Sequence, residues 1–133
     1  MQVVDASVLV EYLTDGEHYE ATRRQIRARP GWLWAPYLVD AEVGNALRRT
    51  ARAGEISARK ARAALTDLFE MRLQRVSHHL LVDRAWQLRE NLSFYDGLYV
   101  ALAEALEAPL LTLDSRLAKA PGIRAEIEVV QAA

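Results

Sequence analysis

The 133-residue sequence contains no cysteine, few glycines and prolines, and no long apolar run. The absence of cysteine excludes disulfide bonds and thiolate metal sites, and it fits a reducing compartment. No stretch reaches the roughly 18 consecutive apolar residues that a membrane span needs. The first residues lack the basic segment of a signal peptide, and they carry Asp5 and Glu11 within their apolar run. These absences predict a cytoplasmic protein with no membrane association.

The composition is that of a folded protein, with 51% hydrophobic and 26% charged residues. The net charge of −1 hides an uneven distribution, because residues 23–62 carry ten Arg and Lys against three acids and the rest of the chain is acidic. Such a split fits a polyanion-binding surface. It also fits two helices with solvated basic faces, and charge alone leaves both interpretations open.

Short β-branched runs alternate with longer helical patterns along the chain. Strands are expected near residues 2–4, 32–35, 73–76, 110–113 and 126–130. Pro36 suits the first turn of a helix that reaches about Ala53. Single helices are expected over residues 78–90 and from Ser93 to about Glu107. This alternation predicts one α/β domain over residues 1–133, with a four- to five-stranded, mostly parallel sheet flanked by helices on both faces.

Two of the expected strands end in aspartate, Asp5 after VV and Asp114 after LLTL. The carboxyl ends of parallel strands meet at one rim of a sheet, which is where sites form in open α/β folds. Both acids are therefore expected at that rim. Each could instead be the N-cap of the helix that follows it, because aspartate is favoured there.

Two further carboxylates lie on helix faces that are otherwise apolar. At about 100° per residue, Glu42 falls within an apolar arc, where a carboxylate needs a partner. Arg49, seven residues further on, is one possible partner. Asp96 also lies over apolar surface, yet residues 93–96 match a capping box in which Asp96 bonds back to the Ser93 amide. The local sequence does not decide between a cap and a site for Asp96.

The four acids are more informative as a set than singly. Converging carboxylates raise one another's pKa values unless a divalent cation neutralises them. Ligation by oxygen alone selects Mg²⁺ or Mn²⁺ rather than Zn²⁺. Such an ion suits phosphodiester hydrolysis, because it orients the phosphate, activates a water and stabilises the leaving oxygen. Ser7, two residues after Asp5, is interpreted as a supporting hydroxyl or a cap.

Candidate contacts to RNA come from the basic stretch. Arg48, Arg49 and Arg52 would hold the phosphate backbone without regard to sequence. The tryptophans, Trp32, Trp34 and Trp86, could stack on bases, although packing in the core is the favoured interpretation. The scattered glycines form neither a G-x-G-x-x-G nor a Walker A pattern, which argues against a nucleotide-binding loop.

In order and spacing, four segments resemble a PIN domain, and more closely a VapC toxin of the VapBC type II toxin–antitoxin systems of bacteria and archaea. The segments are VVDASVLVEYL, APYLVDAEVGNALRR, SFYDGLYVALAEAL and LLTLDSRLA. Each is short, but the four together extend over essentially the whole chain in the order of the family. The resemblance is therefore more specific than any one motif.

The resemblance assigns the acidic site of the family to Asp5, Glu42, Asp96 and Asp114, with Ser7 and Thr112 as accompanying hydroxyls. It implies that the three aspartates ligate metal directly or through water, and that Glu42 belongs to the same metal site and positions or deprotonates the attacking water. Some PIN domains carry a fifth acid just after the T-x-D motif. Ser115 and Arg116 stand there in this chain, which leaves open whether one or two metal ions bind.

The resemblance also implies a function and partners. The function is that of a Mg²⁺- or Mn²⁺-dependent endoribonuclease toxin that leaves a 5′-phosphate and a 3′-hydroxyl. The partners are an RNA substrate, a second copy of the chain, and a cognate VapB antitoxin that blocks the site in a heterotetramer or hetero-octamer. DNA would be bound only through the antitoxin. The alternative is a catalytically silent PIN-like module that binds protein or RNA.

Overall fold

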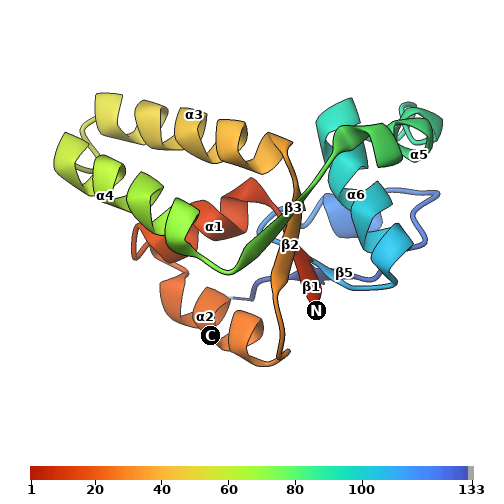
Figure 1. Cartoon of the computed structure of the whole chain (residues 1–133), viewed down its shortest axis with the longest axis horizontal. Coiled ribbons are helices and arrows are strands. Elements are labelled where there is room, and N and C mark those ends of the chain that lie inside the picture. The colour runs from red at the N-terminus through yellow and green to blue at the C-terminus, as the bar shows by residue number, and fades with distance from the viewer. Residues whose placement is uncertain (132–133) are drawn as a thin grey trace.

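The computed structural model describes residues 1–131, which form one parallel sheet covered by helices (Figure 1). The strands are β1 (Gln2–Val4), β2 (Leu33–Pro36), β3 (Leu73–Val76), β4 (Leu110–Thr112) and β5 (Ile127–Val129). Their order is β3-β2-β1-β4-β5, and all neighbours are parallel. The predicted sheet is confirmed, with β1 at its centre and β5 at one edge.

The helices lie on both faces of the sheet, as predicted. They are α1 (Ala6–Leu13), α2 (Tyr19–Arg27), α3 (Leu38–Arg52), α4 (Ala58–Glu70), α5 (Val82–Gln87) and α6 (Phe94–Leu106). Two short 3₁₀ turns are also present: η1 (His78–Leu80) before α5, and η2 (Leu117–Lys119) before β5. Figure 1 shows α1 to α4 on one side of the sheet and α5 and α6 on the other. No helix within residues 1–131 has the length and apolar character needed to cross a membrane.

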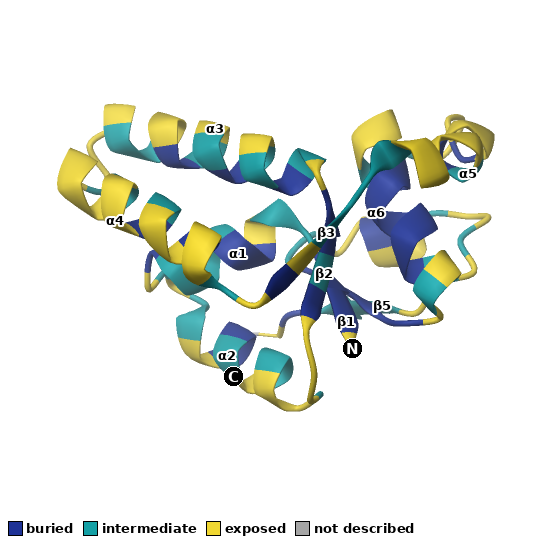
Figure 2. Cartoon of the chain, viewed as in Figure 1, coloured by how far each residue is buried: buried dark blue, intermediate teal, exposed yellow. Residues whose placement is uncertain are grey.

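The core is centred on β1 and α6. Val3 and Val4 are fully buried, as central strands of parallel sheets usually are. The middle of α6 is buried on all sides from Gly97 to Ala103, which explains why its sequence is nearly continuous in apolar residues (Figure 2). Asp96 immediately precedes this buried segment. The carboxylate is therefore carried on an element that the core holds firmly.

Glycine allows α5 and α6 to approach closely beside Asp96. A Cβ atom added at Gly97 would lie 3.2 Å from the Cα, Cβ and carbonyl oxygen of Ala85 in α5. A larger residue would push the two helices apart at this point. The start of α6, and with it Asp96, is therefore positioned by α5 from one side and by the sheet from the other.

Three local expectations are wrong. Pro36 is the last residue of β2 rather than the first of α3, and it is tolerated there because the β1 pairing of β2 involves only Leu33 and Trp34. The helix expected over residues 78–90 is split into η1 and the short α5. Two tryptophans expected in the core are exposed: Trp32 at 44%, and Trp86 at 58%, whose ring stacks on the guanidinium of Arg89 at 4.7 Å.

Candidate active site

Asp5 lies at the carboxyl end of β1 and begins α1. Its Oδ1 accepts hydrogen bonds from Ser7 Oγ at 2.6 Å and from the Val8 amide at 3.2 Å. Its Oδ2 accepts a hydrogen bond from the buried hydroxyl of Thr112, which ends the neighbouring strand β4. Because a carboxylate has about four acceptor positions, roughly one remains free. Asp5 is thus both the N-cap of α1 and a fixed acid at the rim.

Glu42 projects from α3 and is held by a residue of α6. Its Oε1 accepts a hydrogen bond of 2.6 Å from the hydroxyl of Tyr99, which is only 2% exposed. Burial and the neighbouring Glu42 carboxylate raise the pKa of Tyr99 far above its ordinary value, so the hydroxyl stays a donor. Within residues 1–131, Glu42 makes no ion pair with Arg49, the alternative partner that the sequence suggested.

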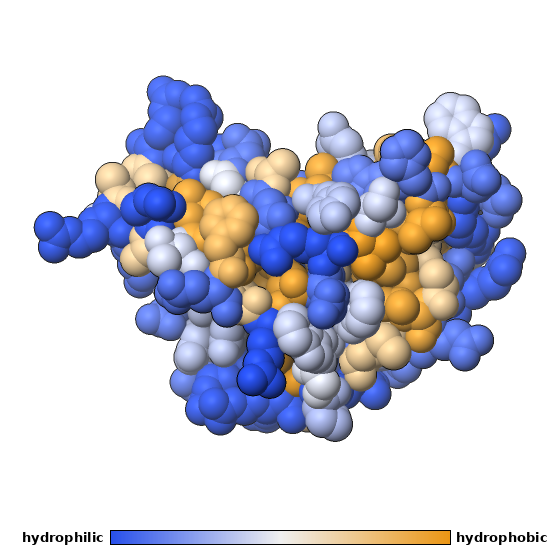
Figure 3. Space-filling model, in the orientation of Figure 1, coloured by the Kyte–Doolittle hydropathy of each residue, from blue (hydrophilic) through white to orange (hydrophobic). Residues whose placement is uncertain are grey.

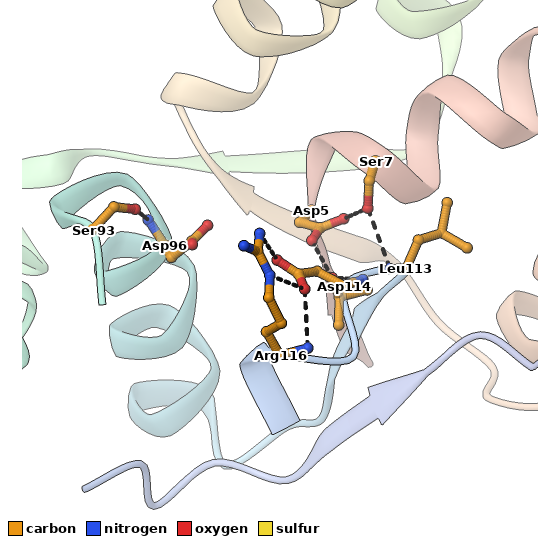
Figure 4. A network of polar contacts seen from close by, with 8 residues as sticks. Asp5, Ser7, Ser93, Asp96, Leu113, Asp114 and Arg116 are labelled. Atoms are coloured by element: carbon orange, nitrogen blue, oxygen red, sulfur yellow. Dashed lines mark hydrogen bonds and ion pairs between the residues drawn. The ribbon is translucent and has the colours of Figure 1, made fainter. Parts of the chain in front are cut away.

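Asp96 lies in the first turn of α6 without completing a capping box. The Ser93 hydroxyl accepts a hydrogen bond from the Asp96 amide at 3.1 Å and caps the helix. Across the described part of the chain, no hydrogen bond joins the Asp96 carboxylate to the Ser93 amide. Figure 4 shows the carboxylate pointing toward Asp114 and Arg116. Capping therefore belongs to Ser93, and the Asp96 carboxylate faces the rim.

Asp114 follows β4 and is bound by a neighbouring arginine. Its amide donates to Thr112 Oγ1 at 3.0 Å, so Thr112 links Asp5 to Asp114. Its carboxylate accepts hydrogen bonds from Nε, Nη2 and the amide of Arg116 (Figure 4). These bonds lower the pKa of Asp114, which therefore stays ionised.

The electrostatics indicate that acids from four separate elements act on one another. Burial raises the pKa of Asp5, Glu42 and Asp96. The charge of Asp96 raises the pKa of Asp5 and Glu42 further, and the charge of Asp114 does the same to Asp96. These pairwise effects join the rim acids into one negatively charged region.

The donor set fits a hard divalent cation. Every candidate ligand is a carboxylate oxygen, which suits Mg²⁺ or Mn²⁺, and a cation would relieve the repulsion among the acids. Within residues 1–131, no three Asp, Glu, Cys or His side chains already stand close enough together to hold an ion between them. Mg²⁺ commonly binds through one or two carboxylates and keeps water at its other positions, so an ion here would be held partly through water.

A groove of about 680 Å³ opens beside the acids, between α1, α3 and the start of α6. Asn45, Arg49 and the half-exposed Tyr95 line it together with Glu42 and Ser7. Of the three candidate RNA-binding arginines, Arg49 lines this groove, whereas Arg48 and Arg52 are exposed on α3 without lining it. Figure 3 shows hydrophilic side chains over the ends of α3 and α4 that lie far from the sheet.

Three residues around this site, Tyr99, Arg116 and Tyr95, were not predicted from the sequence. A signal exists for Tyr99, because a tyrosine in a buried apolar helix needs a partner for its hydroxyl. Arg116 stands where some PIN domains have an acid, and Tyr95 belongs to the segment that contains Asp96. Nothing in the local pattern indicates that Tyr95 lines a groove, because its exposure depends on how α6 packs.

Fold and rim together define a class: an α/β domain with carboxylates gathered at the carboxyl edge of a parallel sheet. The model of the PIN domain family matches residues 3–123. Ribonuclease VapC1 of Mycobacterium tuberculosis is 48% identical, with 97% of each chain covered, and Ribonuclease VapC9 of the same organism is 40% identical over 98% of each chain. The chain belongs to the PIN-domain family, in the group of the VapC ribonucleases.

A solved structure supports the same fold at low sequence identity. VapBC2 from Rickettsia felis, bound to a DNA fragment from its promoter, contains a chain that superposes with a TM-score of 0.70 at 16% identity, over 98% of both chains. At that identity, the likeness concerns the fold alone. It agrees with the single sheet and the two helical layers described above.

Proposed function

We propose that this chain is a divalent-metal-dependent endoribonuclease and the toxin of a VapBC pair. The observation that carries the proposal is the meeting of Asp5, Glu42, Asp96 and Asp114 at one rim, beside a groove that Arg49 lines. A scaffold has no need for buried carboxylates that repel one another. The ribonuclease names of the relatives at 48% and 40% identity support the same activity.

In this proposal, Asp5, Asp96 and Asp114 hold Mg²⁺ or Mn²⁺, and Glu42 completes the pocket. Once bound, such an ion polarises the phosphate and lowers the pKa of an attacking water. The protein contributes orientation: the hydroxyls of Ser7 and Thr112 fix Asp5. Water would attack the phosphorus while the P–O3′ bond breaks and the leaving 3′ oxygen takes up a proton, so that the products carry a 5′-phosphate and a 3′-hydroxyl.

Glu42 would position that water or accept its proton. Its pKa is raised by burial, which makes it a stronger base than an exposed glutamate, and the hydroxyl of Tyr99 keeps the carboxylate aimed at the rim. The groove would bind RNA next to it. Arg49 supplies a positive charge for a phosphate, and the ring of Tyr95 offers a face on which an unpaired base can stack.

The proposed partners are a VapB antitoxin and a second copy of the chain. The structure of VapBC2 from Rickettsia felis, whose chain shares this fold, supports the antitoxin as a partner. The chain also exposes several large apolar side chains that a partner could cover, among them Phe69, Leu80 and Trp86. Assembly would be a heterotetramer or hetero-octamer in which promoter DNA is contacted through VapB.

Cleavage of RNA by point variants tests the proposal. Wild-type protein with Mg²⁺ should cut a cellular RNA pool, and sequencing of the 5′-phosphate ends should identify the sites. Asp5→Asn and Asp96→Asn should abolish the cuts while circular dichroism stays unchanged. Asp83→Asn, an exposed acid on α5, is the matched control and should cut normally. Full activity of either rim variant would refute the mechanism.

A silent PIN-like binding module is the second candidate. It predicts no ion binding, so Mn²⁺ should leave the thermal unfolding midpoint of the protein unchanged. The nuclease predicts a rise with Mn²⁺ concentration by mass action, of about 2.7 kcal/mol in unfolding free energy at 100 times the dissociation constant. An unchanged midpoint together with intact RNA would favour the module.

A further inference from the structure

Arg116 covers one corner of the acidic rim. Both of its guanidinium contacts go to Asp114: Nε lies 3.1 Å from Oδ1 and Nη2 lies 3.0 Å from Oδ2. The Asp96 carboxylate faces the same guanidinium and raises the pKa of Arg116, while Arg116 lowers the pKa of Asp96 (Figure 4). The arginine thus serves as a counterion for two of the acids assigned to the metal.

The two oxygens of Asp114 are held differently. Oδ1 accepts from the Arg116 amide at 2.9 Å as well as from Nε, whereas Oδ2 accepts only from Nη2 among the described residues. The Asp114 amide is separately tied to Thr112. If the guanidinium moved away, the hydrogen bonds made by the backbone amides of Arg116 and Asp114 would still orient the carboxylate. Oδ2 would then be free to bind a cation.

The guanidinium itself is held weakly. The side chain of Arg116 is 90% exposed, and its hydrogen bonds in residues 1–131 go to Asp114 alone. Exposed ion pairs of this kind contribute little, because water screens them and ordering a long side chain opposes them. A divalent ion carries twice the charge and also interacts with Asp5 and Asp96, so it competes well for the same oxygen.

We propose that Arg116 is an exchangeable counterion, which occupies Asp114 Oδ2 in the metal-free protein and gives up that oxygen when a divalent cation binds. Arg116 is then a competitor of the cation: until an ion binds, it neutralises the ionised Asp114 and offsets the repulsion between Asp114 and Asp96. The inference rests on the proposed metal-dependent function, and it assigns to this chain's own arginine a role in how the ion enters.

Calorimetric titration of Mn²⁺ into the full chain, with no RNA present, tests the exchange. Arg116→Ala should bind Mn²⁺ about two- to fivefold more tightly, which is the factor that an exposed ion pair represents. Lys119→Ala, which removes the same charge three residues away, is the matched control and should leave the affinity unchanged. Apo stability of Arg116→Ala should match wild type, because the lost pair is exposed.

A double-variant cycle separates direct exchange from repulsion at a distance. In Asp114→Asn, the arginine has lost its carboxylate, so adding Arg116→Ala should give no further gain in Mn²⁺ affinity. A gain that persists in that background would overturn the inference, as would weaker or unchanged binding by Arg116→Ala alone. If the wild-type protein binds no Mn²⁺, the proposed function itself fails, and this inference fails with it.

Discussion

Removing the Tyr99 hydroxyl should lower the free energy of unfolding by an amount that depends on pH. Tyr99→Phe deletes the donor of the 2.6 Å hydrogen bond to Glu42 and leaves the ring in place, so the core keeps its packing. A hydrogen bond to a charged group contributes about 1.5–3 kcal/mol. Glu42 is only half-buried and water can partly replace the lost donor. The lower end, about 1.5 kcal/mol, is therefore expected at neutral pH.

The sign of the pH dependence follows from the raised pKa of Glu42. Its charged form is disfavoured in the folded protein, chiefly by burial, and the Tyr99 hydroxyl opposes that effect. The charge-dependent part of the destabilisation is therefore absent below the unfolded pKa of about 4.3, where Glu42 is protonated in both states and only a weaker, neutral hydrogen bond is lost. It grows as pH rises through the folded pKa. Tyr99→Phe should accordingly lose more stability at pH 8 than at pH 4.

Urea unfolding of metal-free protein at the two pH values is the assay. At pH 8 the variant should lose about 1.5 kcal/mol, and its thermal midpoint should fall by roughly 4–8 °C for a chain of this size. Tyr37→Phe, an exposed tyrosine, should change neither. Combining Tyr99→Phe with Glu42→Gln should remove the pH dependence. Equal losses at both pH values, or strict additivity with Glu42→Gln, would refute the assigned role of Tyr99.

Three further predictions concern the groove, the helix contact and an ion pair. Arg49→Ala should weaken binding of single-stranded RNA and reduce the salt dependence of log K by about one phosphate contact, as measured by fluorescence anisotropy. Gly97→Ala should lower stability by about 1 kcal/mol through its contact with Ala85, whereas Gly44→Ala, which has open space, should raise it by about 0.5–1 kcal/mol in urea unfolding. Burial raises the pKa of Glu104, but Arg84 and the amide of Arg124 lower it below its ordinary value, so stability from this pair is present at neutral pH and lost on acidification. In urea unfolding, Arg84→Met should therefore lower the free energy of unfolding less at pH 3.5 than at pH 7.

The fold could be predicted from the sequence because short strand-like runs alternate with longer helical patterns, and only the segment over residues 78–90 departs from the expected helix. The rim could be predicted for the same reason, since Asp5 and Asp114 end two such strands and their place on a parallel sheet is set by chain direction. The two roles that the sequence left open for Asp5 turn out to coincide: the carboxylate caps α1 through the Val8 amide and also faces the rim.

The partners within the site could not be predicted, because they depend on packing between distant elements. Glu42 pairs with Tyr99, 57 residues away, rather than with Arg49 on its own helix. The exposure of Trp86 could not be predicted, because α5 is only six residues long and its apolar pattern is too short to define a buried side. Arg116 and Asp114 pair because they lie two residues apart in the chain. That Arg116 also faces Asp96 could not be predicted, because Asp96 lies on α6.

The place of β1 in the sheet determines when the acidic rim can exist. The hydroxyl that bonds Asp5 Oδ2 belongs to Thr112, which is synthesised 107 residues later, and β4 pairs with β1 across a similar separation. Parallel pairing of this kind forms only after the distant strand is available. During translation, the site of the nascent chain is therefore incomplete until residues 110–114 have emerged from the ribosome. The whole segment between β1 and β4 must therefore be synthesised before the proposed site can act on any RNA, including the message being translated.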